Sequence, residues 1–169
     1  PLGVRAILFP NRKSKGRIRN ESSNKKMDKL ENKTAGEITE VGKIVHDVFD
    51  EGLRFIIMRG PFHWCGYVGI PKDHPLAGLS YDDISFVSVH GGLTFASEAR
   101  DNWPQGYYWY GWDYGHAGDK SHFERSFNFP DSGEKDWTIK EVIEDSWETL
   151  YDFHKLMKVA ERIASKSKK

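Results

Sequence analysis

The feature that most restricts how this chain can fold is a run of aromatic residues that leads directly into a segment punctuated by glycines. Five of the six residues at 107–112 are aromatic, and Gly115 and Gly118 follow shortly afterwards. Side chains alternate between the two faces of a strand, so this run can form a strand with two bulky faces. The glycines disfavour a continuous helix through the region. We therefore predict a strand over residues 107–112 that ends in an open loop.

The last part of the chain carries the clearest helix pattern. Thr138 and Glu141 have the spacing of a capping box, in which each side chain accepts a hydrogen bond from a free amide at the helix start. Residues suited to one buried face then recur at helical spacing: Ile139, Val142, Ile143, Ser146, Leu150, Met157 and Ala160. The pattern predicts a long helix that runs to about Ile163. A similar spacing of apolar residues predicts an earlier helix over residues 35–50, ended by Gly52.

Strand patterns occupy the region between these two helices. Residues 53–59 and 64–70 are rich in apolar and β-branched side chains and are separated by Gly60-Pro61, which predicts a hairpin. Weaker patterns predict short strands at 84–89 and 93–96, and long loops at 71–83 and 120–136. The predicted fold class is α+β, a small antiparallel sheet with an N-terminal helix and a long C-terminal helix.

The charges are distributed very unevenly, although the formal net charge is zero. Residues 1–26 hold eight Lys or Arg against one Glu, a local charge of +7, so the remainder carries −7. We expect this segment to be a disordered basic arm, or a non-native leader that ends where the composition changes at Met27. A single α+β domain is expected over residues 27–165, with a basic tail at 166–169. Binding to nucleic acid is not expected unless it occurs through the arm.

The cysteine count and the hydropathy of the sequence indicate in which cellular compartment the protein is expected. The chain has one cysteine, Cys65, which excludes an internal disulfide and a zinc site built on two cysteines. No apolar run is long enough to cross a membrane, so we expect a reducing cytoplasm and no membrane partner. His63 and Cys65 lie two apart and share a strand face, but no third group or electropositive setting favours a nucleophilic thiol.

Histidine and aspartate residues mark the candidate site. Asp113, His116 and Asp119 follow the aromatic run, and His90 precedes two glycines earlier in the chain. A carboxylate beside a histidine can orient the ring for proton transfer, so these four residues are the catalytic candidates if the protein is an enzyme. His90, His116 and Asp119 could instead bind a divalent metal. In a third interpretation, the two aspartates only cap turns. Apart from this possible divalent metal ion, no cofactor is expected.

Backbone and aromatic groups near these residues suggest a place for a ligand. Gly91 and Gly92 would let the backbone approach an anion closely, and Thr94 adds a hydroxyl group. Arg59 is the best placed candidate for a phosphate ligand because it ends a predicted strand, and the other cationic candidates are Arg54, Arg100 and Lys120. Aromatic faces can stack on a base, and the candidates for this role are Tyr108, Tyr110 and Trp112. These aromatics could equally pack the core, and the paired glycines could form only a tight bend.

Five short strings follow one another along the chain: WCGYVG at 64–69, HPL at 74–76, LSYDD at 79–83, VHGGLTF at 89–95 and GWDYGHAGD at 111–119. As an ordered set they resemble a family of small proteins common in tailed-phage genomes and prophages. The family's last motif more often has Phe, Cys and Ala where this chain has Trp112, Tyr114 and Gly115, which argues against a thiol role at position 114. The resemblance implies a phage or prophage setting, and no mechanism.

These observations lead to three functional hypotheses. The first is a phage-type accessory protein that binds a small phosphorylated ligand, expected to be a nucleotide, and counters host defence by sequestering a nucleotide signal. The second is a hydrolase or phosphoesterase that acts on such a nucleotide through His90, His116 and either Asp113 or Asp119. The third is an inhibitor that docks on a host protein. The expected location is the cytoplasm of a bacterial host cell, and a homo-oligomer is compatible with all three.

Overall fold

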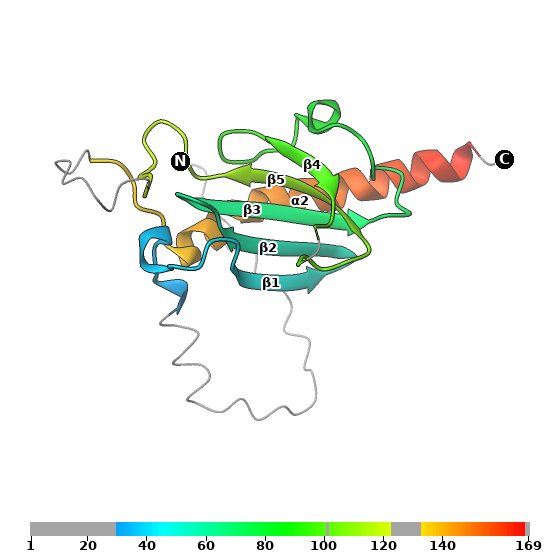
Figure 1. Cartoon of the computed structure of the whole chain (residues 1–169). Coiled ribbons are helices and arrows are strands. Elements are labelled where there is room, and N and C mark those ends of the chain that lie inside the picture. The colour runs from blue at the N-terminus through cyan, green and yellow to red at the C-terminus, as the bar shows by residue number, and fades with distance from the viewer. Residues whose placement is uncertain (1–29, 101, 123–132, 168–169) are drawn as a thin grey trace, which may run out of the picture.

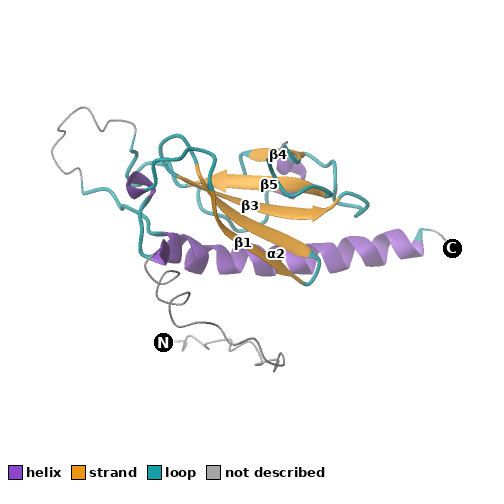
Figure 2. Ribbon diagram, turned by 60° about the horizontal axis from the view of Figure 1, so that its bottom comes forward, coloured by secondary structure: helices purple, strands orange, loops and turns teal. Residues whose placement is uncertain are grey.

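The computed structural model describes residues 30–100, 102–122 and 133–167 and consists of one sheet and one long helix (Figure 1). The strands are β1 (Ile44–Asp50), β2 (Leu53–Arg59), β3 (Trp64–Pro71), β4 (Phe95–Glu98) and β5 (Tyr107–Asp113), in the order β1-β2-β3-β5-β4. Every neighbouring pair is antiparallel. The helix, α2 (Ile139–Lys166), runs along one face of this sheet, and its last turns extend past the strands (Figures 1 and 2). The predicted α+β class is confirmed.

Several predicted elements are present with small changes in their limits. The predicted hairpin is formed by β2 and β3, and the aromatic run forms β5. The candidate strand at 93–96 occurs as β4, shifted to Phe95–Glu98. The candidate at 84–89 is wrong, because residues Tyr81–Ile84 form the short helix η2 and the chain then turns. Ser80 and Asp83 close a capping box at η2, and that local hydrogen bonding competes with strand pairing.

The helix predicted over residues 35–50 is also wrong. Ala35–Glu37 forms only the short helix η1, and Ile44–Asp50 is strand β1, which pairs with β2 at the edge of the sheet. Gly42 interrupts the segment with a φ of 82°, which no helix contains. The β-branched residues in β1 suit a strand, and Arg54 of β2 donates to Asp47 of β1 at 2.8 Å. Cross-strand pairing therefore overrode the helical spacing of the apolar residues.

Both faces of the sheet are covered by apolar side chains. The face toward α2 is the larger and includes Phe55, Val68, Tyr110 and Trp112, against which Phe153 of the helix packs. The opposite face holds a smaller cluster of Ile56, Met58, Trp103 and Trp109. Alternation along β5 thus sends its even-numbered aromatics toward the helix and its odd-numbered ones to the other face.

The capping box at the start of α2 is formed as predicted. Thr138 Oγ1 accepts from the Glu141 amide at 3.2 Å, and Glu141 Oε2 accepts from the Thr138 amide at 2.9 Å. The helix continues to Lys166, slightly beyond the predicted end. The hydrogen bond from the Thr138 amide is the main reason that the pKa of Glu141 is lowered. Together with smaller effects of the same sign, it outweighs burial, which raises this pKa.

Replacing Glu141 with Gln is expected to lower the free energy of unfolding at neutral pH by about 0.3–1 kcal/mol, because the negative charge at the helix start is lost. A carboxyl whose pKa is lowered in the folded state stabilises the protein above its ordinary pKa of 4.5, and this contribution disappears as the pH falls through the folded-state value. The difference between Glu141→Gln and the parent should therefore shrink below pH 4.5. Urea denaturation at several pH values measures it, and a constant difference would contradict the assignment.

Some predictions lie outside the described residues. These are the basic arm at 1–26, the proposed start at Met27, residues 123–132 of the predicted loop and the last two residues of the tail. Among the residues that the structure describes, no helix combines the length and the apolar character needed to cross a membrane.

Candidate functional site

The candidate site lies at the end of the sheet where β5 leaves it. Cys65 pairs with Asp113, so the start of β3 and the end of β5 are side by side. The turn before β3 contributes His63, the loop before β4 contributes His90, and the loop after β5 contributes His116 and Asp119. Hydrogen bonds and short contacts between these residues show that the predicted His90 and Asp113–Asp119 groups meet in one place.

Asp119 is the centre of the site. Its Oδ2 accepts from the His90 ring at Nε2 (2.7 Å) and from the His116 amide (3.0 Å), and its Oδ1 accepts from the Trp137 indole N–H (2.7 Å). The Asp119 amide also donates to the His116 carbonyl, which closes a tight turn that contains Gly118 at a φ of 95°. The carboxylate is 7% exposed, so its hydrogen bonds come almost entirely from the protein.

The protonation of Asp119 determines the tautomer of His90. Burial raises the pKa of Asp119, but the hydrogen bonds from His90, Trp137 and the His116 amide outweigh it and hold this pKa below its ordinary value. Because an ionised carboxylate only accepts hydrogen bonds, Nε2 of His90 carries a proton. When the ring is neutral, the His90 lone pair is therefore on Nδ1, and Asp119 orients the ring as a base.

His116 lies against both aspartates without a hydrogen bond from its Nδ1 atom. This nitrogen is buried, 3.8 Å from Asp119 Oδ2 and 3.9 Å from Asp113 Oδ1, although 35% of the side chain is exposed. The ring packs directly on Gly91, where a β-carbon would lie 2.0 Å from His116 Cε1. Gly91 therefore provides the space that this ring occupies, in addition to the positive φ of 66°.

His63 extends the group beyond the predicted residues. Its Nε2 lies 4.0 Å from Asp113 Oδ1, the same oxygen that accepts from the Gly115 amide at 3.0 Å. A β-carbon on Gly115 would lie 2.6 Å from the His63 ring. Contacts between successive side chains link His63, Asp113, His116, Asp119 and His90 in that order. The sequence analysis had considered His63 only as a partner of Cys65.

Trp137 is the second residue that the sequence analysis missed. Besides its bond to Asp119, its ring lies 5.0 Å from the His90 ring centre and 4.9 Å from that of Tyr114. Tyr114 stacks on His90 at 4.5 Å. The capping box locates Trp137 just before the helix, but nothing in the sequence indicates where its indole N–H points.

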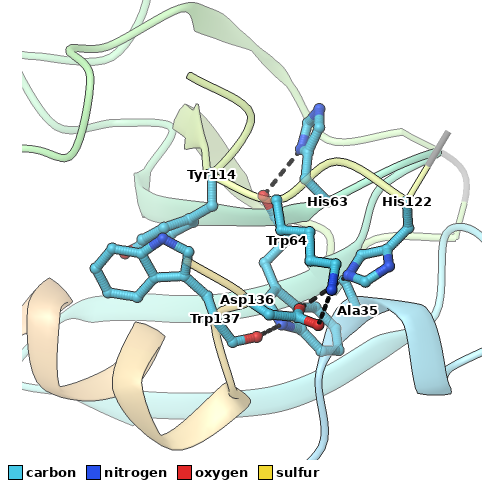
Figure 3. A pocket seen from close by; sticks show the side chains of 8 residues that line it. Ala35, His63, Trp64, Tyr114, His122, Asp136 and Trp137 are labelled. Carbon is cyan, nitrogen blue, oxygen red and sulfur yellow. Dashed lines mark hydrogen bonds and ion pairs between the residues drawn. The ribbon is translucent and has the colours of Figure 1, made fainter. Parts of the chain in front are cut away.

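A small depression lies beside this group and shares His63, Tyr114 and Trp137 with it (Figure 3). Its empty volume is about 160 Å³, and it is lined by Ala35, His63, Trp64, Tyr114, Lys120, His122, Asp136 and Trp137. His122 Nε2 bonds to Asp136 Oδ1 at 2.9 Å, and Lys120 Nζ lies 3.9 Å from the other oxygen of that carboxylate. The empty volume includes open solvent, and the depression holds no space even for a water-sized molecule, so it is not a formed ligand pocket.

The predicted base-stacking residues lie largely in the core. Tyr110 and Trp112 are 0% and 1% exposed on the α2 side of the sheet, and the Tyr110 hydroxyl donates to the Leu76 carbonyl at 2.6 Å. Tyr108 is partly buried and packs beside Tyr110. The core-packing alternative therefore describes Tyr110 and Trp112 correctly, and neither offers a face to a ligand.

The other predicted ligand residues divide into two groups. Arg59 is 5% exposed and donates to the carbonyls of Ile38 and Gly60, so its guanidinium is committed to backbone groups. Gly92 and Thr94 are exposed near the end of β5, where the Gly92 amide closes a turn and the Thr94 amide bonds to Gly111. The paired glycines thus form a tight bend and also make room for His116.

The thiol of Cys65 is close to His63 but is poorly suited to act as a nucleophile. Cys65 Sγ lies 3.8 Å from His63 Nδ1, as their spacing on one strand face allows. Burial raises the pKa of Cys65 to about 11, so the thiol is almost fully protonated at neutral pH. This agrees with the expectation from the sequence.

Comparison with known proteins adds no relative. No family model, curated protein or solved structure matches the chain.

Proposed function

We propose that the protein is a histidine- and aspartate-dependent hydrolase that acts on a small phosphorylated molecule, with a phosphate ester or anhydride as the reacting bond. The observation that carries this proposal is the 2.7 Å hydrogen bond between His90 Nε2 and the buried Asp119, with the ring of His116 packed beside it. A histidine oriented by a carboxylate, next to a second histidine that solvent can reach, is suited to moving protons in both directions.

The roles follow from the contacts of each residue. His90, held by Asp119, would take a proton from the attacking water as its oxygen forms the new bond to phosphorus. His116 would give a proton to the oxygen that leaves as the old bond breaks. Asp113, 3.9 Å from His116, would hold that ring in place. In this scheme Asp119 and Asp113 are positioning residues, and the two histidines are the catalytic residues.

Two lysines next to the site are the candidates for binding an anionic substrate. Lys120 follows Asp119 directly, and its amide bonds to the Lys135 carbonyl at 2.9 Å, so the backbones of the two lysines are adjacent. Lys120 Nζ lies 3.9 Å from Asp136 and Lys135 Nζ lies 3.6 Å from Glu141, so an anion would compete with these carboxylates. Lys120 also lines the depression with His63 and His122. Side chains of this kind are common phosphate ligands. These groups replace Arg59 as the candidates for phosphate binding.

The substrate class that we expect is a nucleotide, in the phage or prophage setting that the resemblance implies. Degradation of a host nucleotide signal would then counter host defence. Sequestration without turnover is less well supported, because Tyr110 and Trp112 are buried and cannot stack on a base.

Incubating the protein with a panel of linear and cyclic nucleotides is expected to give new products for at least one of them. Replacing His116 with Ala should reduce the rate by about 10²–10⁴-fold, as is typical when a general acid or base is lost. His154→Ala is the matched control, because His154 pairs with Asp50 at the opposite end of the sheet. Chromatography of the reaction mixture measures both.

Three outcomes separate the alternatives. Products that disappear with His116→Ala but persist with His154→Ala support the hydrolase. Recovery of intact ligand after the protein is denatured supports sequestration. If no member of the panel is bound or consumed, both proposals are wrong for these substrates.

A docking function has one specific observation in its favour. The outer surface of α2 exposes Tyr151, Val159 and Ile163 at multiples of four residues, so they lie close to one helical stripe. Exposed apolar stripes commonly contact other proteins. An inhibitor that uses this stripe would keep its activity when His116 is replaced and would lose it when Tyr151 and Ile163 are replaced by polar residues.

A further inference from the structure

We infer that His90, His116 and Asp119 form a binding site for a single divalent transition-metal ion. One ligand atom from each residue lies within 4.8 Å of the other two. The three residues come from two different loops, and both loops are held by the end of β5. This inference depends only on the geometry of the side chains and does not require the proposed hydrolase activity, although a bound ion would occupy both histidines that the proposed mechanism uses as acid and base.

Two of the three distances between the ligand atoms are close to those around a bound ion, and the third, between the two ring nitrogens, is within 4.8 Å. Bonds of about 2.0–2.2 Å at tetrahedral angles put neighbouring ligand atoms about 3.3–3.6 Å apart. His116 Nδ1 is 3.8 Å from Asp119 Oδ2, so a few tenths of an ångström of closure would suffice there. His90 Nε2 is 2.7 Å from the same oxygen, because a proton bridges them. The ion would replace that proton and widen this pair by less than 1 Å.

The unpaired nitrogen of His116 points to an ion in particular. Nδ1 is buried and has no hydrogen-bond partner among the described residues, and two carboxylate oxygens lie 3.8 and 3.9 Å away. A buried polar atom without a partner is costly. An ion among these oxygens would pair Nδ1 directly, and the second of them, Asp113 Oδ1, could supply a fourth bond.

The surroundings support the ligands in the way that metal sites require. Asp119 uses its other oxygen to accept from Trp137, which fixes the plane of the carboxylate. The His90 ring is stacked on Tyr114, and the His116 ring is confined by Gly91. Such second contacts hold metal ligands in position and strengthen binding.

The ligand set selects the class of metal. Two imidazoles and one carboxylate suit Zn²⁺, Fe²⁺, Mn²⁺ or Co²⁺, whereas Mg²⁺ and Ca²⁺ prefer oxygen ligands. Three protein ligands would leave at least one position for water or substrate. The exposed side of His116 is the direction from which that molecule would approach.

Titration of the chelator-treated protein with Co²⁺ tests the site without reference to any reaction. The visible absorption of protein-bound Co²⁺ should rise to an end point of one ion per chain and should fall when Zn²⁺ is added. His116→Ala and His90→Ala should each weaken binding by at least about 100-fold, which is the upper range for residues that only support a ligand. The control variants are His122→Ala and His154→Ala, which should bind Co²⁺ as the parent does.

Each result has a definite meaning. Circular dichroism establishes that each variant is folded, and a variant that is not folded is replaced by Gln at the same position. The inference is wrong if the parent does not bind Co²⁺ at millimolar concentration, or if His116→Ala and His90→Ala bind it as tightly as the parent. It is also wrong if His122→Ala alone removes binding. Metal binding without hydrolysis would leave this site intact and overturn the proposed function. Hydrolysis by a protein that does not bind Co²⁺ would support the proposed function and overturn the metal site.

Discussion

Gly91→Ala is expected to abolish the proposed activity and weaken Co²⁺ binding by about 10²-fold, while leaving the fold intact. The added β-carbon would lie 2.0 Å from Cε1 of His116 and within 2.4 Å of both ring nitrogens. The ring is the movable partner, so it must leave its position beside Asp113 and Asp119. A displacement of about 1 Å at a reacting group can cost about 10²-fold in rate.

Gly92→Ala is the matched control for this prediction. Gly92 also has a positive φ, 94°, but its β-carbon would meet nothing within 4 Å. Backbone strain of about 1–2 kcal/mol is expected in both variants. Loss of activity and metal binding only in Gly91→Ala would show that the space under His116 matters. Equal losses in the two variants would attribute the effect to strain in the turn, and the assigned role of Gly91 would be wrong.

Asp119→Ala is expected to give the largest loss of stability of any substitution in the site, about 3 kcal/mol in the free energy of unfolding. The change leaves the His90 ring, the Trp137 indole and the His116 amide without their acceptor. Each orphaned donor costs about 1–3 kcal/mol when it is buried, and the partial exposure of His90 reduces the total. Urea denaturation followed by tryptophan fluorescence measures the difference.

Asp113→Ala tests whether this cost is specific to Asp119. Asp113 is the last residue of β5, directly before the loop that holds Asp119, but its side chain is 29% exposed, and the one hydrogen bond assigned to it among the described residues comes from the Gly115 amide. A loss below about 1 kcal/mol is expected. If the two substitutions destabilise the protein equally, Asp119 is not the structural centre of the site.

The accuracy of the sequence predictions depended on how many independent signals each element carried. The helix after Thr138 combined a capping box with a sustained apolar stripe, and the β2–β3 hairpin combined two β-branched runs with a Gly-Pro turn. Both are confirmed. Residues 35–50 carried only apolar spacing, and the β-branched residues at 44, 45 and 48 suit a strand equally well. Pairing with β2, which no local pattern reveals, decided the outcome.

The candidate site was partly predictable for a related reason. Glycines beside histidines and aspartates indicated which loops were unusual, and His90, His116 and Asp119 do lie together. Arg59 was expected to face a ligand because it ends a strand, but it bonds to the Ile38 carbonyl, which lies in a segment that was predicted to be helical. His63 and Trp137 enter the site only through tertiary contacts, so their roles could not be obtained from residue spacing.

Trp137 also makes completion of the site dependent on a late step in the assembly of the chain. The sheet is built from antiparallel neighbours, most of them close in sequence. The Trp137 indole must reach back to Asp119, and its carbonyl accepts from the indole of Trp64, 73 residues away. Contacts between distant residues close slowly because of the entropy of the loop between them. Strands can therefore pair before Trp137 reaches Asp119, and the carboxylate gains its third hydrogen bond only when the segment before the final helix packs against the sheet.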